Sequence, residues 1–369
     1  MSVLVAVIGG GPAGATCAYH LARAGVEVLL FERDILWEKP CGGGLTPRVF
    51  RAEPDLLRLK LPWREVFEFN LVGPAGRRVR FDLPEPIRII ARGDLDSALR
   101  RRAVSAGARF VAEKVRHLTR RPGGGWQVNR HCVDVAVGAG GINDPLARTL
   151  RLGWQPAQRA LTFGCVIPGR FDSQITCRFW AGLKGYLWWF PRNDSASLGV
   201  EFMAGRANWP RARALLERFA AQDISVNAKI DGGRRFAWAE PMPGPRMLLQ
   251  RPCCGRDWAL IGDSAGLVDA LTGEGLPYAI HSGKMAAEAI AQGQTQQYGQ
   301  TLRSAILAEL AATRRLAGLY YHRLLIDWHL AVIAGNRGQK QLARDYLLGY
   351  KPYRRYWREL LRRLPAMGR

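Results

Sequence analysis

The amino-acid sequence predicts an α/β fold in three parts: a Rossmann-like domain with a parallel sheet, an inserted β-sheet domain, and a helical C-terminal tail. Residues 3–8 predict the first part, because they form a short apolar run typical of a buried strand, and a glycine-rich turn and a helical pattern follow. Short runs separated by turns predict the second part across residues 154–250. A nearly continuous helical pattern from about residue 301 predicts the third.

The first 32 residues are expected to form one βαβ unit with parallel strands. Residues 15–24 are helical in pattern, Gly25 ends that pattern, and residues 26–31 are the next apolar strand. Residues 36–60 are expected to be a loop, because glycines and prolines interrupt them. The predicted division is a cofactor domain over residues 1–60, 90–150 and 251–295, a β-rich substrate domain over residues 61–89 and 151–250, and a basic helical region over residues 296–369.

The composition is ordinary for a globular protein of 369 residues, with 48% hydrophobic and 23% charged residues. The seven cysteines have neither CxxC nor Cys/His ligand spacing, so reduced thiols are expected and no metal site. We find no signal-peptide pattern and no apolar run long enough to span a bilayer, which predicts a cytoplasmic protein. The net charge of +23 would attract lipid head groups, nucleic acid or phosphorylated substrates, without choosing among them.

A dinucleotide fingerprint follows the first strand. Gly9, Gly11 and Gly14 have the spacing G-x-G-x-x-G, and Glu32 ends the second strand. In this motif the first glycine allows a tight turn, the second lets the backbone approach a pyrophosphate, and the third lets the helix pack on the strand. The helix N-terminus offers free N–H groups to phosphates, and the acidic residue accepts hydrogen bonds from a ribose. The motif predicts a dinucleotide and leaves FAD and NAD open.

A second glycine-rich turn lies far downstream, at residues 262–266, and Gly273-Glu274-Gly275-Leu276 opens a later helix. This pair resembles the C-terminal flavin motif of FAD-dependent oxidoreductases related to aromatic hydroxylases. The resemblance implies FAD, with Asp263 on the ribityl chain and the backbone of Gly275 and Leu276 on the flavin pyrimidine. Helix N–H groups there would stabilise the negative charge of reduced flavin.

Arg92 resembles the arginine that opens a helix and reaches the cofactor phosphates in these enzymes; a solvated arginine is the alternative. The remaining residues expected to contact the cofactor are Ala13, Arg33, Cys41, Gly42, Gly44 and Val115.

Two further motifs narrow the family. Lys39-Pro-Cys-Gly-Gly-Gly-Leu45 and Tyr186-Leu-Trp-Trp-Phe-Pro191, with Gly199 after it, resemble the loop and the substrate-domain strand of geranylgeranyl reductases. That family reduces isoprenoid double bonds. The resemblance implies a flat apolar wall formed by Tyr186, Trp188 and Phe190, although an ordinary sheet core would have the same pattern. The glycines after Cys41 are expected to let the backbone press on the flavin ring.

Two residues are candidates for catalysis. Cys41 could donate a proton, contact the cofactor or simply be a small residue. Nothing in the sequence indicates the lowered thiol pKa that would favour a catalytic role. Asp269 could be an acid beside the flavin, or a hydrogen-bonded loop carboxylate. The family often has Ala-Asp-Gly where this chain has Ala139-Gly140-Gly141, which leaves the electron donor open; NAD(P)H, if used, would visit transiently.

The C-terminal region contains a basic amphipathic pattern. Residues 340–369 hold nine Lys and Arg against two acids, and one helical side carries Tyr353, Trp357, Leu360, Leu361 and Leu364. The pattern is typical of a helix on an anionic membrane surface, which would place the protein peripherally on the inner face of the membrane. The alternative is that the apolar stripe packs on the protein itself. No nucleic acid is expected, because no recognised module is found.

The sequence therefore predicts an FAD-dependent oxidoreductase that reduces carbon–carbon double bonds of an isoprenoid or lipid-like substrate by hydride transfer from reduced flavin. Two rivals remain: a flavin monooxygenase acting on an aromatic or polyketide, and a non-catalytic flavin-fold protein that binds a membrane surface.

Overall fold

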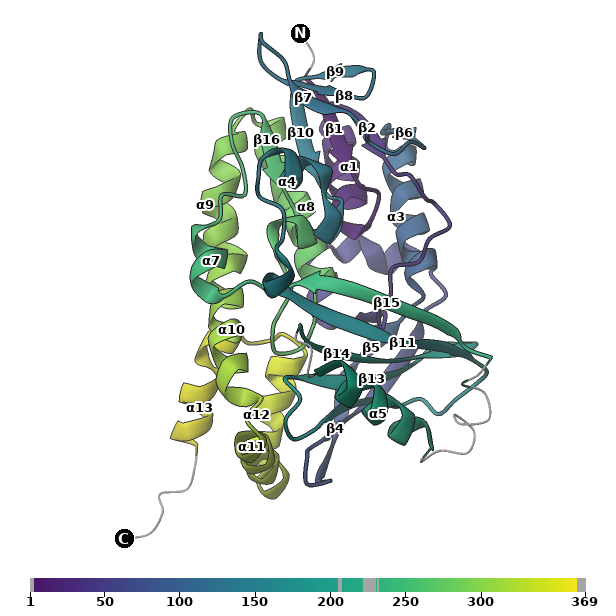
Figure 1. Cartoon of the computed structure of the whole chain (residues 1–369), viewed down its shortest axis with the longest axis vertical. Helices are drawn as coiled ribbons and strands as arrows, with labels where there is room; N and C mark the ends of the chain where they lie inside the picture. Colours follow the sequence, from purple (N-terminus) through teal and green to yellow (C-terminus); the bar gives the residue numbers. More distant parts are fainter. Residues whose placement is uncertain (1–2, 205–207, 222–229, 231, 364–369) are drawn as a thin grey trace.

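The computed structural model describes residues 3–204, 208–221, 230 and 232–363. Sheet A is parallel, as predicted, and its strands lie in the order β16 (Trp258–Leu260), β10 (Val135–Gly138), β1 (Leu4–Ile8), β2 (Glu27–Phe31) and β6 (Arg109–Val111). The strands β16, β10 and β1 are short and almost fully buried, because helices cover one face and a small sheet lies beside them. Figure 1 shows sheet A at one end of the molecule.

Helix α1 (Pro12–Arg23) packs against sheet A, and α3 (Arg92–Ser105) and α8 (Leu276–Ala291) pack against α1. The antiparallel sheet C contains β7 (Leu118–Arg120), β8 (Trp126–Val128) and β9 (His131–Val133). The short helices α4 (Pro145–Thr149), α7 (Pro245–Gln250) and α9 (Tyr298–Leu302) complete this part.

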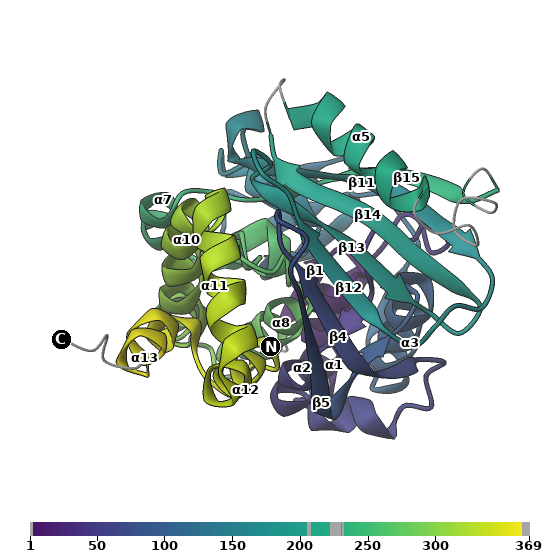
Figure 2. The ribbon, with the colours of Figure 1, turned by 90° about the horizontal axis from the view of Figure 1, so that it is seen from below.

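Sheet B is larger and mostly antiparallel. Its strands lie in the order β15 (Arg234–Pro241), β11 (Arg159–Pro168), β14 (Ser195–Met203), β13 (Gly185–Pro191), β12 (Ile175–Phe179), β4 (Arg64–Val72), β5 (Arg78–Ile89) and β3 (Gly44–Leu45). Helix α5 (Asn208–Ala221) covers the outer face of the sheet, where Ala212 and Leu216 pack with Leu187 and Leu198 (Figure 2). The inner face turns toward sheet A and the C-terminal helices.

The region between the first βαβ unit and sheet B is more ordered than expected. Residues 36–60, predicted to be a loop, contain α2 (Pro47–Ala52), a 3₁₀ turn over Pro54–Arg58, and the edge strand β3. Proline at the first helical position is compatible with a helix, because its missing N–H would be unpaired there anyway. Strand β3 pairs with β5, so a segment within the range predicted for the cofactor domain extends sheet B.

The C-terminal helices are α10 (Ala308–Tyr320), α11 (Arg323–Gly335), α12 (Arg337–Leu347) and α13 (Tyr356–Arg362). They pack beside sheet B, where Tyr353, Tyr356 and Leu360 join one buried cluster with residues of β4, β5 and β12. Tyr353 and Leu360 are therefore buried in the protein, whereas Leu361 is exposed, and the predicted apolar stripe is only partly available to a membrane. The Trp357 side chain and Leu364 lie outside the described residues.

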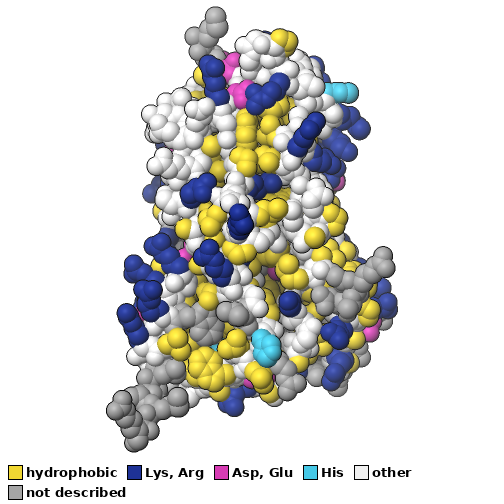
Figure 3. Space-filling model, turned by 60° about the vertical axis from the view of Figure 1, so that its left-hand side comes forward, with side chains coloured by type: hydrophobic (Ala, Val, Ile, Leu, Met, Phe, Trp, Pro, Cys, Tyr) yellow, Lys and Arg dark blue, Asp and Glu magenta, His cyan; other side chains and the backbone are white. Residues whose placement is uncertain are grey.

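None of the described helices has the length and apolarity that a membrane-crossing helix needs. On the face drawn in Figure 3, Lys and Arg side chains clearly outnumber Asp and Glu, in keeping with the net charge of +23.

Candidate active site

The two glycine-rich turns meet in one groove. Strands β1, β10 and β16 are parallel neighbours, so the turns that follow them leave the sheet at the same edge. A cavity of about 400 Å³ lies there, and its lining includes the following residues from both turns: Gly9, Gly11, Ala13, Gly262, Asp263, Gly275 and Leu276. Two motifs at opposite ends of the predicted cofactor domain therefore form one elongated binding groove.

Steric constraints explain the glycines of the first turn. Gly9 has φ +118°, which side chains with a Cβ rarely adopt, and a Cβ on Gly14 would overlap the Gly9 carbonyl oxygen. A Cβ on Gly11, by contrast, would meet nothing within 4 Å. That position opens into the groove, so its backbone is available to a pyrophosphate. The geometry fits the role expected of each glycine in a dinucleotide turn.

Glu32 is fixed at the end of β2. Its Oε2 accepts a hydrogen bond of 2.8 Å from the Gly10 N–H, and its Oε1 accepts bonds of 2.8 and 3.1 Å from the N–H groups of Arg33 and Asp34. Glu32, Arg33 and Val115 all line the groove. A carboxylate held against the glycine turn is suited to a ribose diol, so these residues fit the adenosine half of FAD.

The other half of the groove is strongly charged. Lys39 Nζ donates a hydrogen bond of 2.6 Å to Asp263 Oδ2 and lies 3.6 Å from Glu240 Oε1. Burial lowers the pKa of Lys39, but the two carboxylates outweigh it and raise the pKa above its ordinary value. Arg92 forms a two-bond ion pair with Asp96, 2.9 Å for each bond, and lines the same groove.

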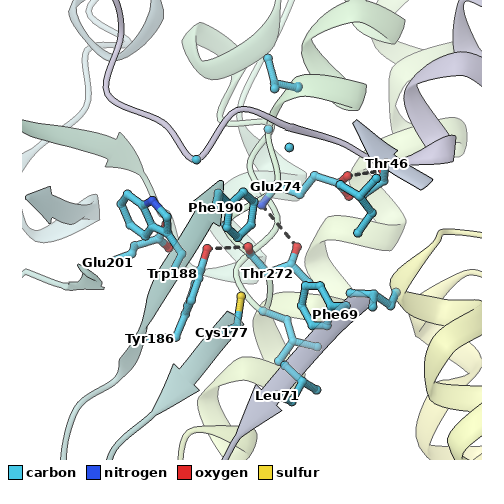
Figure 4. A pocket seen from close by; sticks show the side chains of 18 of the residues that line it. Thr46, Phe69, Leu71, Cys177, Tyr186, Trp188, Phe190, Glu201, Thr272 and Glu274 are labelled. Carbon is cyan, nitrogen blue, oxygen red and sulfur yellow. Dashed lines mark hydrogen bonds between the residues drawn. The ribbon is translucent and has the colours of Figure 1, made fainter. Parts of the chain in front are cut away.

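A second, apolar cavity of about 200 Å³ adjoins the groove. Tyr186, Trp188 and Phe190 of β13 line it, with further aromatic side chains at Phe69, Phe81, Phe179, Tyr320, Tyr346, Tyr353 and Tyr356. Figure 4 shows Tyr186, Trp188 and Phe190 projecting in turn from one strand toward the cavity. Of the residues that the structure describes, five line both spaces: Cys41, Glu240, Gly273, Gly275 and Leu276. A bound cofactor would therefore present one end to an aromatic chamber.

Close packing explains the aromatic motif. Trp188 pairs with Gly199 across β13 and β14, and its indole ring occupies the space that a Cβ on Gly199 would need. The Trp188 Nε1–H donates to Ser197 Oγ at 3.0 Å, and that hydroxyl donates to the Cys41 carbonyl oxygen at 3.1 Å. Two consecutive hydrogen bonds therefore connect the aromatic wall to the Cys41 loop.

Comparison with known proteins places the chain in a family. Residues 5–39 match the model of the FAD-dependent oxidoreductase (DAO) family. The chain is 30% identical to geranylgeranyl diphosphate reductase of Rhodobacter capsulatus, over 77% of this chain and 73% of that protein. The chain belongs to the geranylgeranyl reductase family of FAD-dependent oxidoreductases. This confirms the family and the cofactor that the motifs predicted.

Other relatives include one that is named after a different substrate. The chloroplastic geranylgeranyl diphosphate reductase of Nicotiana tabacum is 30% identical over 78% of this chain, which spans 66% of that protein's length. A menaquinone reductase of Mycobacterium tuberculosis is also 30% identical, over 77% of this chain and 75% of that protein.

A solved structure from Thermoplasma acidophilum, described as geranylgeranyl bacteriochlorophyll reductase-like, has a TM-score of 0.75 at 19% identity and covers 98% of both chains. A flavin-dependent brominase has a TM-score of 0.71 at 18% identity, with 98% of both chains covered. At these identities the likeness concerns the fold alone.

The structure gives the Cys41 loop a second reason for its glycines. A Cβ on Gly42 or Gly44 would lie 2.7 or 2.8 Å from ring carbons of Phe190, so both glycines are needed to pack on the aromatic wall. Cys41 itself lies between the groove and the cavity, and its Sγ accepts a hydrogen bond of 3.3 Å from the Gly43 N–H. This placement is compatible with contact to both cofactor and substrate.

Asp269 is placed differently from the other candidates. It is fully buried, lines neither space, and its Oδ1 accepts hydrogen bonds from the N–H groups of Leu271 and Thr272 at 2.8 and 3.2 Å. These bonds shape the loop that leads to Gly273. The structure therefore favours the hydrogen-bonded loop carboxylate over the acid beside the flavin.

Sequence reasoning missed three charged residues. Lys39 was inside a recognised motif, yet its ion pairs with Asp263 and Glu240 join distant segments. Glu240 and Glu201 lie on the inner face of sheet B, where burial raises the pKa of each carboxyl group. A charged residue inside the apolar run of β14 was the signal that could have indicated Glu201.

Proposed function

We propose that this protein saturates carbon–carbon double bonds of an isoprenoid or other lipid-like substrate, with FAD as the hydride carrier. The observation that carries the proposal is the direct junction between the cofactor groove and the aromatic cavity at Cys41, Gly273 and Gly275. An apolar chamber that opens onto the redox end of a flavin suits an unsaturated hydrocarbon chain. The names of the related reductases, which act on prenyl groups or a quinone, support the same substrate class.

Different residues of the chain would bind the parts of the cofactor and the substrate. The first glycine turn and Glu32 would hold the adenosine and pyrophosphate, Asp263 the ribityl chain, and Tyr186, Trp188 and Phe190 the substrate. When bound, the flavin supplies the hydride. The aromatic walls would exclude water from the reacting double bond, and the ion pair with Lys39 would hold Asp263 in position.

Two finer points belong to the same proposal. NAD(P)H is proposed as a transient reductant, because one dinucleotide fingerprint is present and the flavin must be reduced in each cycle. Peripheral contact with an anionic membrane is proposed through residues 340–369. There Arg354, Arg355 and Arg358 are exposed while Tyr353 and Leu360 are buried, so the attraction would be electrostatic and would weaken with salt.

Anaerobic reoxidation tests the function. The purified yellow protein would be photoreduced, mixed with geranylgeranyl diphosphate or menaquinone in separate samples, and followed by the return of the flavin absorbance. We expect reoxidation by at least one of these probes, with a product heavier by two hydrogens per reduced bond. Reoxidation by neither probe, with oxygen-coupled hydroxylation of an aromatic compound instead, would identify a monooxygenase; a colourless protein without bound FAD would favour the non-catalytic rival.

A further inference from the structure

The aromatic cavity contains a carboxylic acid that the proposed function does not yet use. Glu201 lies on β14 opposite Thr162 of β11 and Tyr186 of β13, so all three side chains are on the inner face of sheet B. Glu201 is only 6% exposed and lines the cavity (Figure 4). Within the described residues, no hydrogen bond or ion pair reaches its carboxyl group. A buried polar group is normally satisfied, so this one is available to a ligand.

The carboxyl group lies where cofactor and substrate would meet. Gly273 lines both the groove and the cavity, and a Cβ on Gly273 would be 2.6 Å from Glu201 Oε2. The acid is therefore directly beside the junction of the two spaces. Tyr186, whose hydroxyl donates to the Thr272 carbonyl oxygen at 2.6 Å, holds the same loop in place.

The surroundings keep this group protonated. Burial raises the pKa of Glu201 well above its ordinary value, the charge of Glu240 adds to that effect, and Lys39 opposes it. The titratable and charged groups that face it come from β12, β13, β15, the turn after α10, the loop before β3 and the loop before α8. They are Cys177, Tyr186, Glu240, Tyr321, Lys39 and Asp269. Among them only Lys39 carries a positive charge, and that charge is already paired with Asp263.

We propose that Glu201 is the catalytic acid that donates the proton during double-bond reduction. This inference rests on the proposed function. Saturation breaks the π bond and forms two C–H bonds: one carbon receives the hydride, with its electron pair, from the reduced flavin, and the other receives a proton from the Glu201 carboxyl group. The substrate is reduced and the flavin oxidised. The Glu201 carboxylate then regains a proton from solvent before the next turnover.

The test compares Glu201→Gln with wild type, and Glu217→Gln, an exposed change on α5, is the matched control. Each protein is loaded with FAD, photoreduced without oxygen and mixed with geranylgeranyl diphosphate or menaquinone, or with molecular oxygen. General acid catalysis contributes about 10²–10⁴-fold, so reoxidation by the organic probe should slow by at least about 100-fold in Glu201→Gln. FAD content, the Tm and reoxidation by oxygen should stay as in wild type.

The pH profile supplies a readout that a structural role would not change. In wild type the single-turnover rate should fall as the pH rises through the raised pKa, because only the protonated acid donates; Glu201→Gln should lose this limb, and Glu201→Asp should recover part of the rate. Unchanged rates and pH profile in Glu201→Gln would overturn the assignment. A wild-type protein that neither probe reoxidises would instead overturn the proposed function, and the assignment with it.

Discussion

Substitution of Gly199 by alanine tests whether the aromatic wall depends on one missing methyl group. The Trp188 ring lies over Gly199: its Cε2 atom is 2.6 Å from the position of an added Cβ, and two other ring carbons are closer. Neither the ring nor the central strand β14 can move freely, because Trp188 is 5% exposed and β14 pairs on both sides. An added methyl group would therefore force the indole out of its packed position, at a cost in stability.

The expected cost has three parts. Overpacking of a well-packed core typically costs about 1–3 kcal/mol. A shifted indole would also lose the 3.0 Å hydrogen bond to Ser197 Oγ, which contributes about 1 kcal/mol. Replacing glycine by alanine lowers the conformational entropy of the unfolded chain, which offsets about 0.4–1 kcal/mol of this destabilisation. The net destabilisation is therefore about 2 kcal/mol, and the Tm should fall by a few degrees.

The assay is thermal unfolding of the FAD-loaded protein, with Gly318→Ala as the control. Gly318 is an exposed glycine inside α10, and an added Cβ would meet nothing within 4 Å, so that variant should be more stable by about 0.5–1 kcal/mol. Because Ser197 also donates to the Cys41 carbonyl oxygen, Gly199→Ala should slow reoxidation by the organic probe while FAD binding persists. A Gly199→Ala protein as stable as Gly318→Ala would refute the packing argument.

Two further predictions concern the cofactor groove and acid stability. In Gly14→Ala the new Cβ would overlap the Gly9 carbonyl oxygen and displace the glycine turn, at an overpacking cost of about 1–3 kcal/mol. If that cost falls on the bound state, FAD should bind about tenfold more weakly or worse, as measured by titration of the apoprotein. For buried Glu53, burial raises the pKa, but hydrogen bonds from His20 and Arg102 outweigh it and lower the pKa from 4.5 to about 2. This corresponds to about 3 kcal/mol of stability that is present above about pH 4.5 and is lost as the pH falls toward 2, so a plot of Tm against pH should have a shallower acid limb in Glu53→Gln; an unchanged limb would contradict the ion-pair argument.

The cofactor-binding core could be predicted from sequence because its signals are local. The strand, the glycine turn and Glu32 are adjacent in sequence, and their order alone implies parallel strands with a phosphate site at the helix N-terminus. The second turn at Asp263 was recognised through its own short motif. That both turns line one groove followed from the rule that parallel strands leave a sheet at the same edge.

The C-terminal region shows where local patterns stop being informative. Its apolar spacing is compatible with a helix on a membrane surface and with a helix packed on the protein's own core. The spacing alone does not distinguish the two. In the structure, Tyr353 and Leu360 pack into the core with residues of β4 and β5, and a 3₁₀ turn over Tyr353–Arg355 precedes α13. Of the described side chains in the stripe, only Leu361 keeps the exposure that a surface helix would need.

The charged residues between the two spaces could not be predicted, because their chemistry depends on contacts between distant segments. Lys39 forms an ion pair with Asp263 in the groove, whereas no cation in the described part of the chain forms an ion pair with Glu201 on the cavity side. Asp263 is therefore held by an ion pair in the groove, whereas Glu201 keeps its proton in the cavity. Lys39→Met would remove the cation that holds Asp263 in place, so titration of the apoprotein should show weaker FAD binding. Because Lys39 opposes the rise in the pKa of Glu201, the same variant should leave the Glu201 acid protonated.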